Sequence, residues 1–219
     1  MPSLVIAIAD GAGSARLSEL GARATVDYLL RRIPNDLSRI FDANNIIARR
    51  WLEAARSHLE DIASKESCAL SDLGCTILFA VLGESASFFC QIGDGAWIAN
   101  YHGEYIPVIW PSDGEYVNET TFLTSANWAD SIKCRMLTDI SAVAGFTDGL
   151  QRLALQMDTQ SVYAPFFDPL FGVLRKAEDE SGLISPLIEF LSSERFAERT
   201  DDDKTLVLAC HLEPLLLQC

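Results

Sequence analysis

The sequence has few basic side chains and no long hydrophobic run. Its 17 lysines and arginines face 31 aspartates and glutamates among 219 residues, for a formal charge of −14. Such a field repels a phosphate backbone, so nucleic acid is excluded as a partner. No uncharged apolar run approaches the roughly 18 residues of a membrane helix, and the apolar start at 4–9 is too short for a signal peptide. We therefore expect no membrane association and a cytoplasmic location.

The sequence also lacks motifs for a zinc site, for a catalytic nucleophile and for dinucleotide binding. The six cysteines include no C-x-x-C pair, the three histidines are scattered, and no G-x-S-x-G sequence occurs. The cysteines are typical of reduced core thiols in a cytosolic protein. The run from Asp10 to Ala15 resembles half of a dinucleotide fingerprint, but Arg16 stands where its third glycine belongs.

The remaining composition and periodicity predict a globular protein with antiparallel sheet and helices. Hydrophobic residues make up 49% of the chain and charged residues 22%, and we expect one domain over 1–219. The order of elements favours sheet layered with helices over a βαβ alternation. Helices are predicted at about 18–34, 44–65, 149–157, 163–178 and 184–196, and strands at 4–9, 140–146 and 205–211.

The middle of the chain predicts an antiparallel meander followed by an irregular excursion. Short β-rich runs are separated by two- to four-residue turn sequences. The polar stretch at 111–137 then predicts a surface flap. The four strands of the meander are predicted at 76–82, 87–92, 96–101 and 105–110.

Three apolar runs stop abruptly at an Asp-Gly pair, with Asp10, Asp94 and Asp148 as the acidic residues. Carboxylates at strand ends are rigid oxygen ligands for hard cations such as Mg²⁺ and Mn²⁺. Asp-Gly is also the commonest tight-turn pair and needs no metal. Helical segments follow Asp10 and Asp148, which argues against hairpins there, whereas Asp94 could begin a hairpin with 96–101.

A further acidic cluster, 201–203, precedes the last predicted strand. Three adjacent carboxylates repel each other, and a bound cation would relieve that repulsion. A solvated acidic loop explains the triplet equally well. Both interpretations stay open on the residues alone.

Taken in order, these segments resemble the motifs of the metal-dependent protein phosphatases, the type 2C serine/threonine class, in its bacterial-type branch. The resemblance spans about residues 5 to 212. It implies an α/β fold of α+β type, a four-layer αββα sandwich of two antiparallel sheets flanked by helix pairs. The segments are Ala9-Asp10-Gly11-Ala12-Gly13-Ser14 with Gly21-Ala22, Gly74-Cys75-Thr76, Gly93-Asp94-Gly95, Thr147-Asp148-Gly149 and Asp202-Asp203-Lys204-Thr205.

The resemblance also implies a site and an activity. Asp10 would bridge two Mg²⁺ or Mn²⁺ ions, Gly11 would give a backbone carbonyl, and Asp148 and Asp202 would hold one metal. Asp94 falls where some members bind a third, weaker metal. A water bridging the metals would hydrolyse phosphoserine or phosphothreonine in a phosphoprotein, opposing a partner kinase, with the flap at 111–137 near the substrate.

Two departures from the family pattern bear on activity. Many members have histidine after the first Asp-Gly as a proton donor, and this chain has Ala12, so the general acid must come from elsewhere or from metal-bound water. Only Met1-Pro2-Ser3 precede Leu4, where the family has a strand and loop with an acidic residue and an arginine. Either the sequence is truncated or starts at the wrong codon, or the protein lacks part of its site. We expect the first, because true loss of a central strand would leave a sheet edge exposed. The alternatives are a pseudophosphatase that binds phosphoproteins, and a hydrolase of small phosphorylated metabolites.

Overall fold

The computed structural model of the chain describes residues 3–35, 37–111, 120–177, 179–193, 200 and 202–211. Within these residues the main strands form two four-stranded antiparallel sheets. The first sheet has the order β1 (Ser3–Ile8), β2 (Ile77–Gly83), β3 (Ser87–Ile92) and β6 (Lys133–Leu137). The second has the order β10 (Leu206–Cys210), β7 (Ile140–Phe146), β4 (Ala96–Tyr101) and β5 (Glu104–Ile109).

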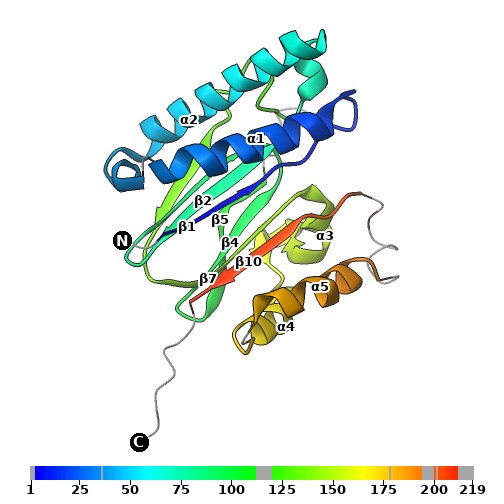
Figure 1. Cartoon of the computed structure of the whole chain (residues 1–219). Helices are drawn as coiled ribbons and strands as arrows, with labels where there is room; N and C mark the ends of the chain where they lie inside the picture. Colours follow the sequence, from blue (N-terminus) through cyan, green and yellow to red (C-terminus); the bar gives the residue numbers. More distant parts are fainter. Residues whose placement is uncertain are drawn as a thin grey trace, which may run out of the picture.

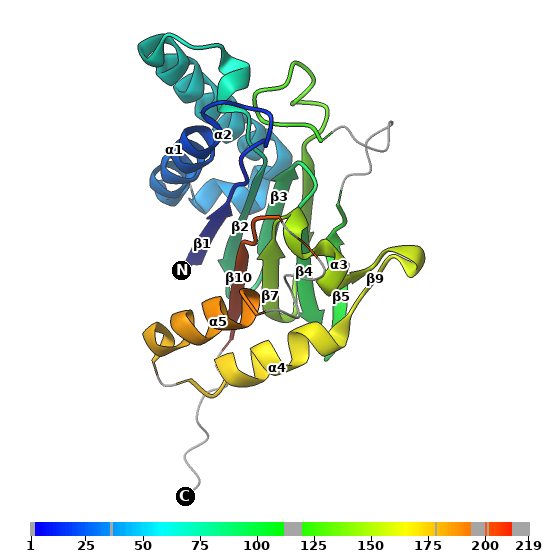
Figure 2. The same ribbon diagram turned by 90° about the vertical axis from the view of Figure 1, so that its right-hand side faces the viewer.

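Helices cover the outer face of each sheet (Figure 1, Figure 2). The first sheet is covered by α1 (Ser18–Arg32) and α2 (Leu37–Glu66), and the second by α3 (Gln151–Ala154), α4 (Ala164–Leu174) and α5 (Ile184–Leu191). Short 3-10 turns and a two-stranded ribbon complete the described structure. They are η1 (Ile33–Asn35), η2 (Leu70–Leu73), η3 (Asp148–Leu150), η4 (Met157–Thr159), η5 (Glu180–Leu183), β8 (Leu155–Gln156) and β9 (Ser161–Val162). No helix in the described residues is long and apolar enough to cross a membrane.

The apolar core lies in three layers, and this confirms the predicted four-layer αββα fold. Trp51 and Phe79 pack between the first sheet and its helices. Phe89 and Trp97 pack between the two sheets, and Phe167 belongs to the layer beneath α4. Because both faces of the sheets are covered, strands such as β2 and β3 are buried along almost their whole length, which explains their continuous apolar sequence.

The predicted meander is wrong at its centre. β2 pairs with β3 and β4 pairs with β5, but β3 and β4 belong to different sheets. At Asp94-Gly95 the chain crosses from one sheet to the other instead of forming a hairpin. A Cβ atom at Gly95 would lie 2.6 Å from the carbonyl oxygen of Phe146, so this crossing passes directly against β7. A tight Asp-Gly turn and a sheet crossing have the same local sequence.

Several predicted boundaries also differ from the structure. The end of the predicted flap, 133–137, is β6, paired with β3, while 112–119 lie outside the described residues. The predicted helix at 149–157 ends at Ala154, because the chain turns into the β8–β9 ribbon. α2 begins at Leu37 rather than 44, and α4 and α5 are shorter than predicted. The end of the last predicted helix, 194–196, lies outside the described residues.

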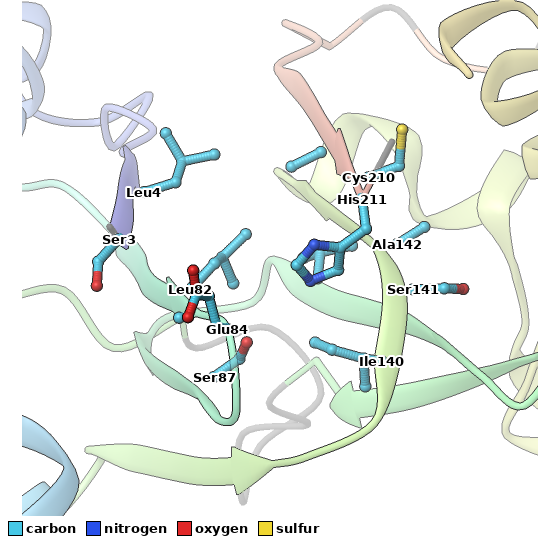
Figure 3. A pocket seen from close by; sticks show the side chains of 13 residues that line it. Ser3, Leu4, Leu82, Glu84, Ser87, Ile140, Ser141, Ala142, Cys210 and His211 are labelled. Carbon is cyan, nitrogen blue, oxygen red and sulfur yellow. The ribbon is translucent and has the colours of Figure 1, made fainter. Parts of the chain in front are cut away.

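β1 and β10 are the outermost strands of their sheets on the same side of the described structure. β1 is therefore half-buried, not fully buried as its apolar run predicts, and Leu4 is 52% exposed. A groove of about 920 Å³ runs beside β10, between that strand and the helices α4 and α5. A smaller cavity of about 500 Å³, shown in Figure 3, is lined by the start of β1 and β7 and the end of β2 and β10, with the His211 side chain pointing into it.

Candidate metal centre at one end of the sheets

The sheet topology brings four of the predicted site residues to one end of the molecule. β1 and β3 are both antiparallel to β2, so they end on the same side of the first sheet, and Asp10 and Asp94 follow these strand ends. In the second sheet Phe146, at the end of β7, pairs with the first residues of both β4 and β10. This register places Asp148 beside Asp94 and Asp202. The cavity of Figure 3 lies at the opposite end of the sheets and takes no part in this site.

Asp10 is held by the segment that leads into β2. Its N–H donates to the Thr76 hydroxyl at 3.0 Å, and the Thr76 N–H donates to the Asp10 carbonyl at 2.8 Å. Gly11 forms an isolated antiparallel bridge with Cys75. A Cβ atom at Gly11 would lie 2.8 Å from the Cβ atom of Ser18, so glycine lets the chain pass close to the start of α1.

Asp148 is fixed by contacts between the end of β7 and the approach to β10. The N–H of Thr147 donates to the Thr205 carbonyl, and the Thr205 N–H donates to the Thr147 hydroxyl, both at 3.2 Å. A Cβ atom at Gly149 would lie 2.2 Å from the carbonyl oxygen of Asp203, so only glycine permits this close approach. The two acidic segments are therefore joined through their backbones.

Three polar side chains, two of them from distant parts of the sequence, hold Asp94. The Gln151 amide donates to the Asp94 carbonyl at 2.6 Å. The buried Gln91 amide donates to the carbonyls of both glycines that flank Asp94, at 3.1 and 2.7 Å. The Thr120 hydroxyl donates to the Asp94 carboxylate at 2.5 Å. These bonds fix both the backbone and the carboxylate of Asp94.

The four carboxylates repel one another. Burial, followed by repulsion from Asp94, Asp202 and Asp10, raises the pKa of Asp148 to about 7. Burial also raises the pKa of Asp10, with a contribution from Asp202, whereas the hydrogen bond from Asp148 lowers it. Without a bound cation, Asp148 is therefore the carboxyl group that keeps a proton up to about pH 7, and it shares this proton with Asp10 through their hydrogen bond. A divalent cation would replace that proton and relieve the repulsion.

Carboxylate oxygens are suitable ligands for a hard divalent cation, although these side chains do not surround a single position in the structure. The Asp148 Oδ1 atom is buried and has no hydrogen-bond partner, which is costly unless a ligand occupies it. The Asp202 side chain is exposed. In the described part of the chain, no three or more His, Cys, Asp or Glu side chains are already placed to hold one ion. Carbonyl or water oxygens would complete the ligands of a bound cation.

Two neighbouring residues limit other chemistry at this end. The pKa of Cys75 is raised to about 11, mainly by burial and partly by the negative charge of Asp10, against a lowering effect of the hydrogen bond with Thr25. Cys75 is therefore a neutral thiol at physiological pH and a poor nucleophile. Ala12 is 5% exposed and its N–H donates to the Gly74 carbonyl. As the sequence predicts, the position after Asp10-Gly11 offers no proton donor.

Sequence reasoning missed the residues that position Asp94. Gln151 and Thr120 lie far from Asp94 in the sequence and form no motif with it, and Gln91 lies in β3 just before Asp94. Gln91 stands out only as a polar side chain in an otherwise apolar strand, and it is 1% exposed. Thr76 and Thr147 belong to the segments quoted for the family resemblance, but their hydroxyl bonds to the backbone appear only in the structure.

Comparisons with known proteins agree with this arrangement. A sequence profile described as Protein phosphatase 2C matches residues 2–192. Serine/threonine-protein phosphatase 3 of Escherichia coli (strain K12) is 36% identical over 220 residues, covering 97% of this chain and 85% of that protein. The crystal structure of a bacterial serine phosphatase matches with a TM-score of 0.66 at 15% identity, covering 96% and 87% of the two chains. RsbX in complex with magnesium matches with a TM-score of 0.53 at 18% identity, covering 94% and 80%.

Proposed function

We propose that this chain, which belongs to the protein phosphatase 2C family, removes phosphate from phosphoserine and phosphothreonine in proteins by metal-dependent hydrolysis. The observation that carries the proposal is the buried, unpartnered Oδ1 atom of Asp148 among mutually repelling carboxylates. Such a group is costly in a folded protein unless it binds a cation. The identity of 36% to a serine/threonine-protein phosphatase over nearly the whole chain supports the same activity.

The proposed ligands are the residues that the sheet ends bring together. Asp10, the Gly11 carbonyl, Asp148 and Asp202 would hold two Mg²⁺ or Mn²⁺ ions, and Asp94 would contribute to a third, weaker site. When bound, these cations supply charge neutralisation for the phosphate and lower the pKa of water for attack on phosphorus. Thr76, Thr147 and Gln151 contribute by fixing the backbone at the acidic segments, which keeps the carboxylates in place.

The proposed substrate is a phosphoprotein that a partner kinase has modified. Thr120, at the start of the described part of the predicted flap, donates to the Asp94 carboxylate, which supports a place for this segment beside the substrate. A substrate peptide would approach across this segment. No feature of the described residues specifically favours the noncatalytic alternative.

The test is hydrolysis of phosphothreonine and phosphotyrosine peptides by the wild type, Asp148→Asn and Asp158→Asn. Asp158 lies on the exposed η4 turn and serves as a matched control. We expect Mn²⁺-dependent release of phosphate from the phosphothreonine peptide by the wild type and Asp158→Asn, and none in excess chelator. Asp148→Asn should lose at least roughly 100-fold in kcat.

Two results would refute the proposal. One is an inactive wild type in Mn²⁺, which would leave the pseudophosphatase and the hydrolase of small phosphorylated metabolites as the alternatives. The other is equal activity of wild type and Asp148→Asn, which would remove Asp148 from the site.

A further inference from the structure

We propose that Arg56 on α2 is a positioning residue for the phosphatase reaction, because it fastens the segment that holds Thr120 against Asp94. This inference rests on the proposed function. Arg56 lies 46 positions from Asp10 in the sequence (56 − 10) and belongs to none of the acidic segments. Its connection to the site runs through backbone carbonyls of residues 123 and 125.

The Arg56 guanidinium binds two carbonyls of a single turn. Its Nη1 atom donates to the Leu123 carbonyl at 2.7 Å and to the Ser125 carbonyl at 3.2 Å. The Arg56 side chain is only 20% exposed, and its Nε atom lies 3.6 Å from the Glu60 carboxylate. Hydrogen bonds from a charged, largely buried donor are stronger than neutral ones. Arg56 is thus a fixed attachment point for the turn and not a solvated surface cation.

The turn that Arg56 binds is itself closed and attached beside the candidate metal centre. The Phe122 N–H donates to the Ser125 hydroxyl, and the Ser125 N–H donates to the Phe122 carbonyl, both at 3.0 Å. Leu123 is fully buried, and its N–H donates to the carbonyl of Cys75 at 2.9 Å. Cys75 is the bridge partner of Gly11. The turn therefore links α2 to Cys75, which in turn pairs with the residue that follows Asp10.

Thr120 precedes this turn by two residues and carries the effect to Asp94. Its hydroxyl donates to the Asp94 carboxylate at 2.5 Å. Because Thr120 is only two residues from the turn, we expect release of the turn to let Thr120 move away from Asp94. The Asp94 carboxylate would then lose its hydrogen-bond donor and its fixed orientation, although its backbone remains held by Gln151. Arg56 is expected to affect Mn²⁺ binding at Asp94 and the approach of the peptide, and not the folding of the sheets.

The experiment compares Arg56→Ala, Arg56→Lys, Thr120→Val and the double variant Arg56→Ala/Thr120→Val. Arg49→Ala is the control, because Arg49 lies on the same helix and, within the described residues, forms an exposed pair with Glu53 at 3.1 Å. The measurements are the half-saturating Mn²⁺ concentration, KM and kcat for a phosphothreonine peptide, and hydrogen exchange of the amides at 122–125. All variants are first compared by thermal unfolding.

We expect Arg56→Ala and Thr120→Val each to raise the half-saturating Mn²⁺ concentration and KM by roughly three- to tenfold, as for the loss of one hydrogen bond. Arg56→Lys, which keeps a donor, should lie nearer the wild type. The double variant should be no worse than the worse single variant, because both act through one contact. Hydrogen exchange at 122–125 should become faster in Arg56→Ala and remain slow in Arg49→Ala.

Additive effects in the double variant would overturn the proposal, as would equal Mn²⁺ dependence and KM for Arg56→Ala and Arg49→Ala. A fall in kcat alone with unchanged Mn²⁺ dependence would also contradict it. An inactive wild type refutes the proposed function instead, and the hydrogen-exchange comparison then shows separately whether Arg56 holds the turn.

Discussion

At the scale of the residue, Asp148 links the stability of the chain to its proposed function. Its pKa of about 7 lies well above the ordinary value of 3.8 because it is partly buried near other carboxylates. Below that ordinary value both folded and unfolded chains carry the proton. Between the two values only the folded chain carries it, so protonation favours folding. This stabilisation is lost as pH rises through about 7.

We therefore predict that the metal-free protein unfolds at a lower temperature at about pH 8 than at about pH 5.5. Asp148→Asn should reduce that difference and unfold at a higher temperature than the wild type at the higher pH, because an amide needs no proton there. Thermal unfolding in chelator measures both effects, with Asp158→Asn as the control. An identical pH dependence in wild type and Asp148→Asn would contradict the burial and repulsion assigned to Asp148.

At the scale of the element, local periodicity predicted most helices and strands. Trp51, Ala55 and Leu59 are buried at helical spacing on α2, as their pattern indicates. The crossing at Asp94-Gly95 could not be predicted, because the partner that excludes a hairpin is the backbone of distant β7. The end of α3 was missed for a similar reason: the Ala154 carbonyl accepts the N–H of Tyr163, which lies beyond the β8–β9 ribbon.

Close packing of α1 against η2 gives a prediction at the same scale. A Cβ atom at Gly21 on α1 would lie 2.1 Å from the Leu73 carbonyl oxygen, whereas nothing lies within 4 Å of one at Gly172 on α4. We expect Gly21→Ala to lower the free energy of unfolding by roughly 2–3 kcal/mol, because backbone must move. Gly172→Ala should raise it by roughly 0.5–1 kcal/mol through helix propensity.

Denaturant unfolding of both alanine variants measures these changes. The matched glycines lie in helices and receive the same methyl group, so their difference reports the space around each position. Similar free energies of unfolding for the two variants would contradict the close approach of α1 to Leu73.

At the scale of the whole molecule, two sheets are needed to assemble the candidate metal centre. Asp10 and Asp94 follow strands of the first sheet, and Asp148 and Asp202 flank strands of the second. The sequence predicted these carboxylates as site residues because each follows or precedes an apolar run. It could not predict the supports from Gln151, Thr120 and Arg56, since each is a single polar side chain whose partner lies in another segment. The Gln91 contact is local, but no turn motif in the sequence predicts it.

Calorimetric titration with Mn²⁺ at about pH 7 tests the central claim, that these sheet ends form a divalent-metal site, most directly. We predict saturable binding by the wild type and by Asp158→Asn, with proton release that reflects displacement of the shared Asp148 proton. Asp148→Asn should lose the tightest binding event and that proton release. Binding of equal affinity, stoichiometry and proton release in Asp148→Asn would contradict the account.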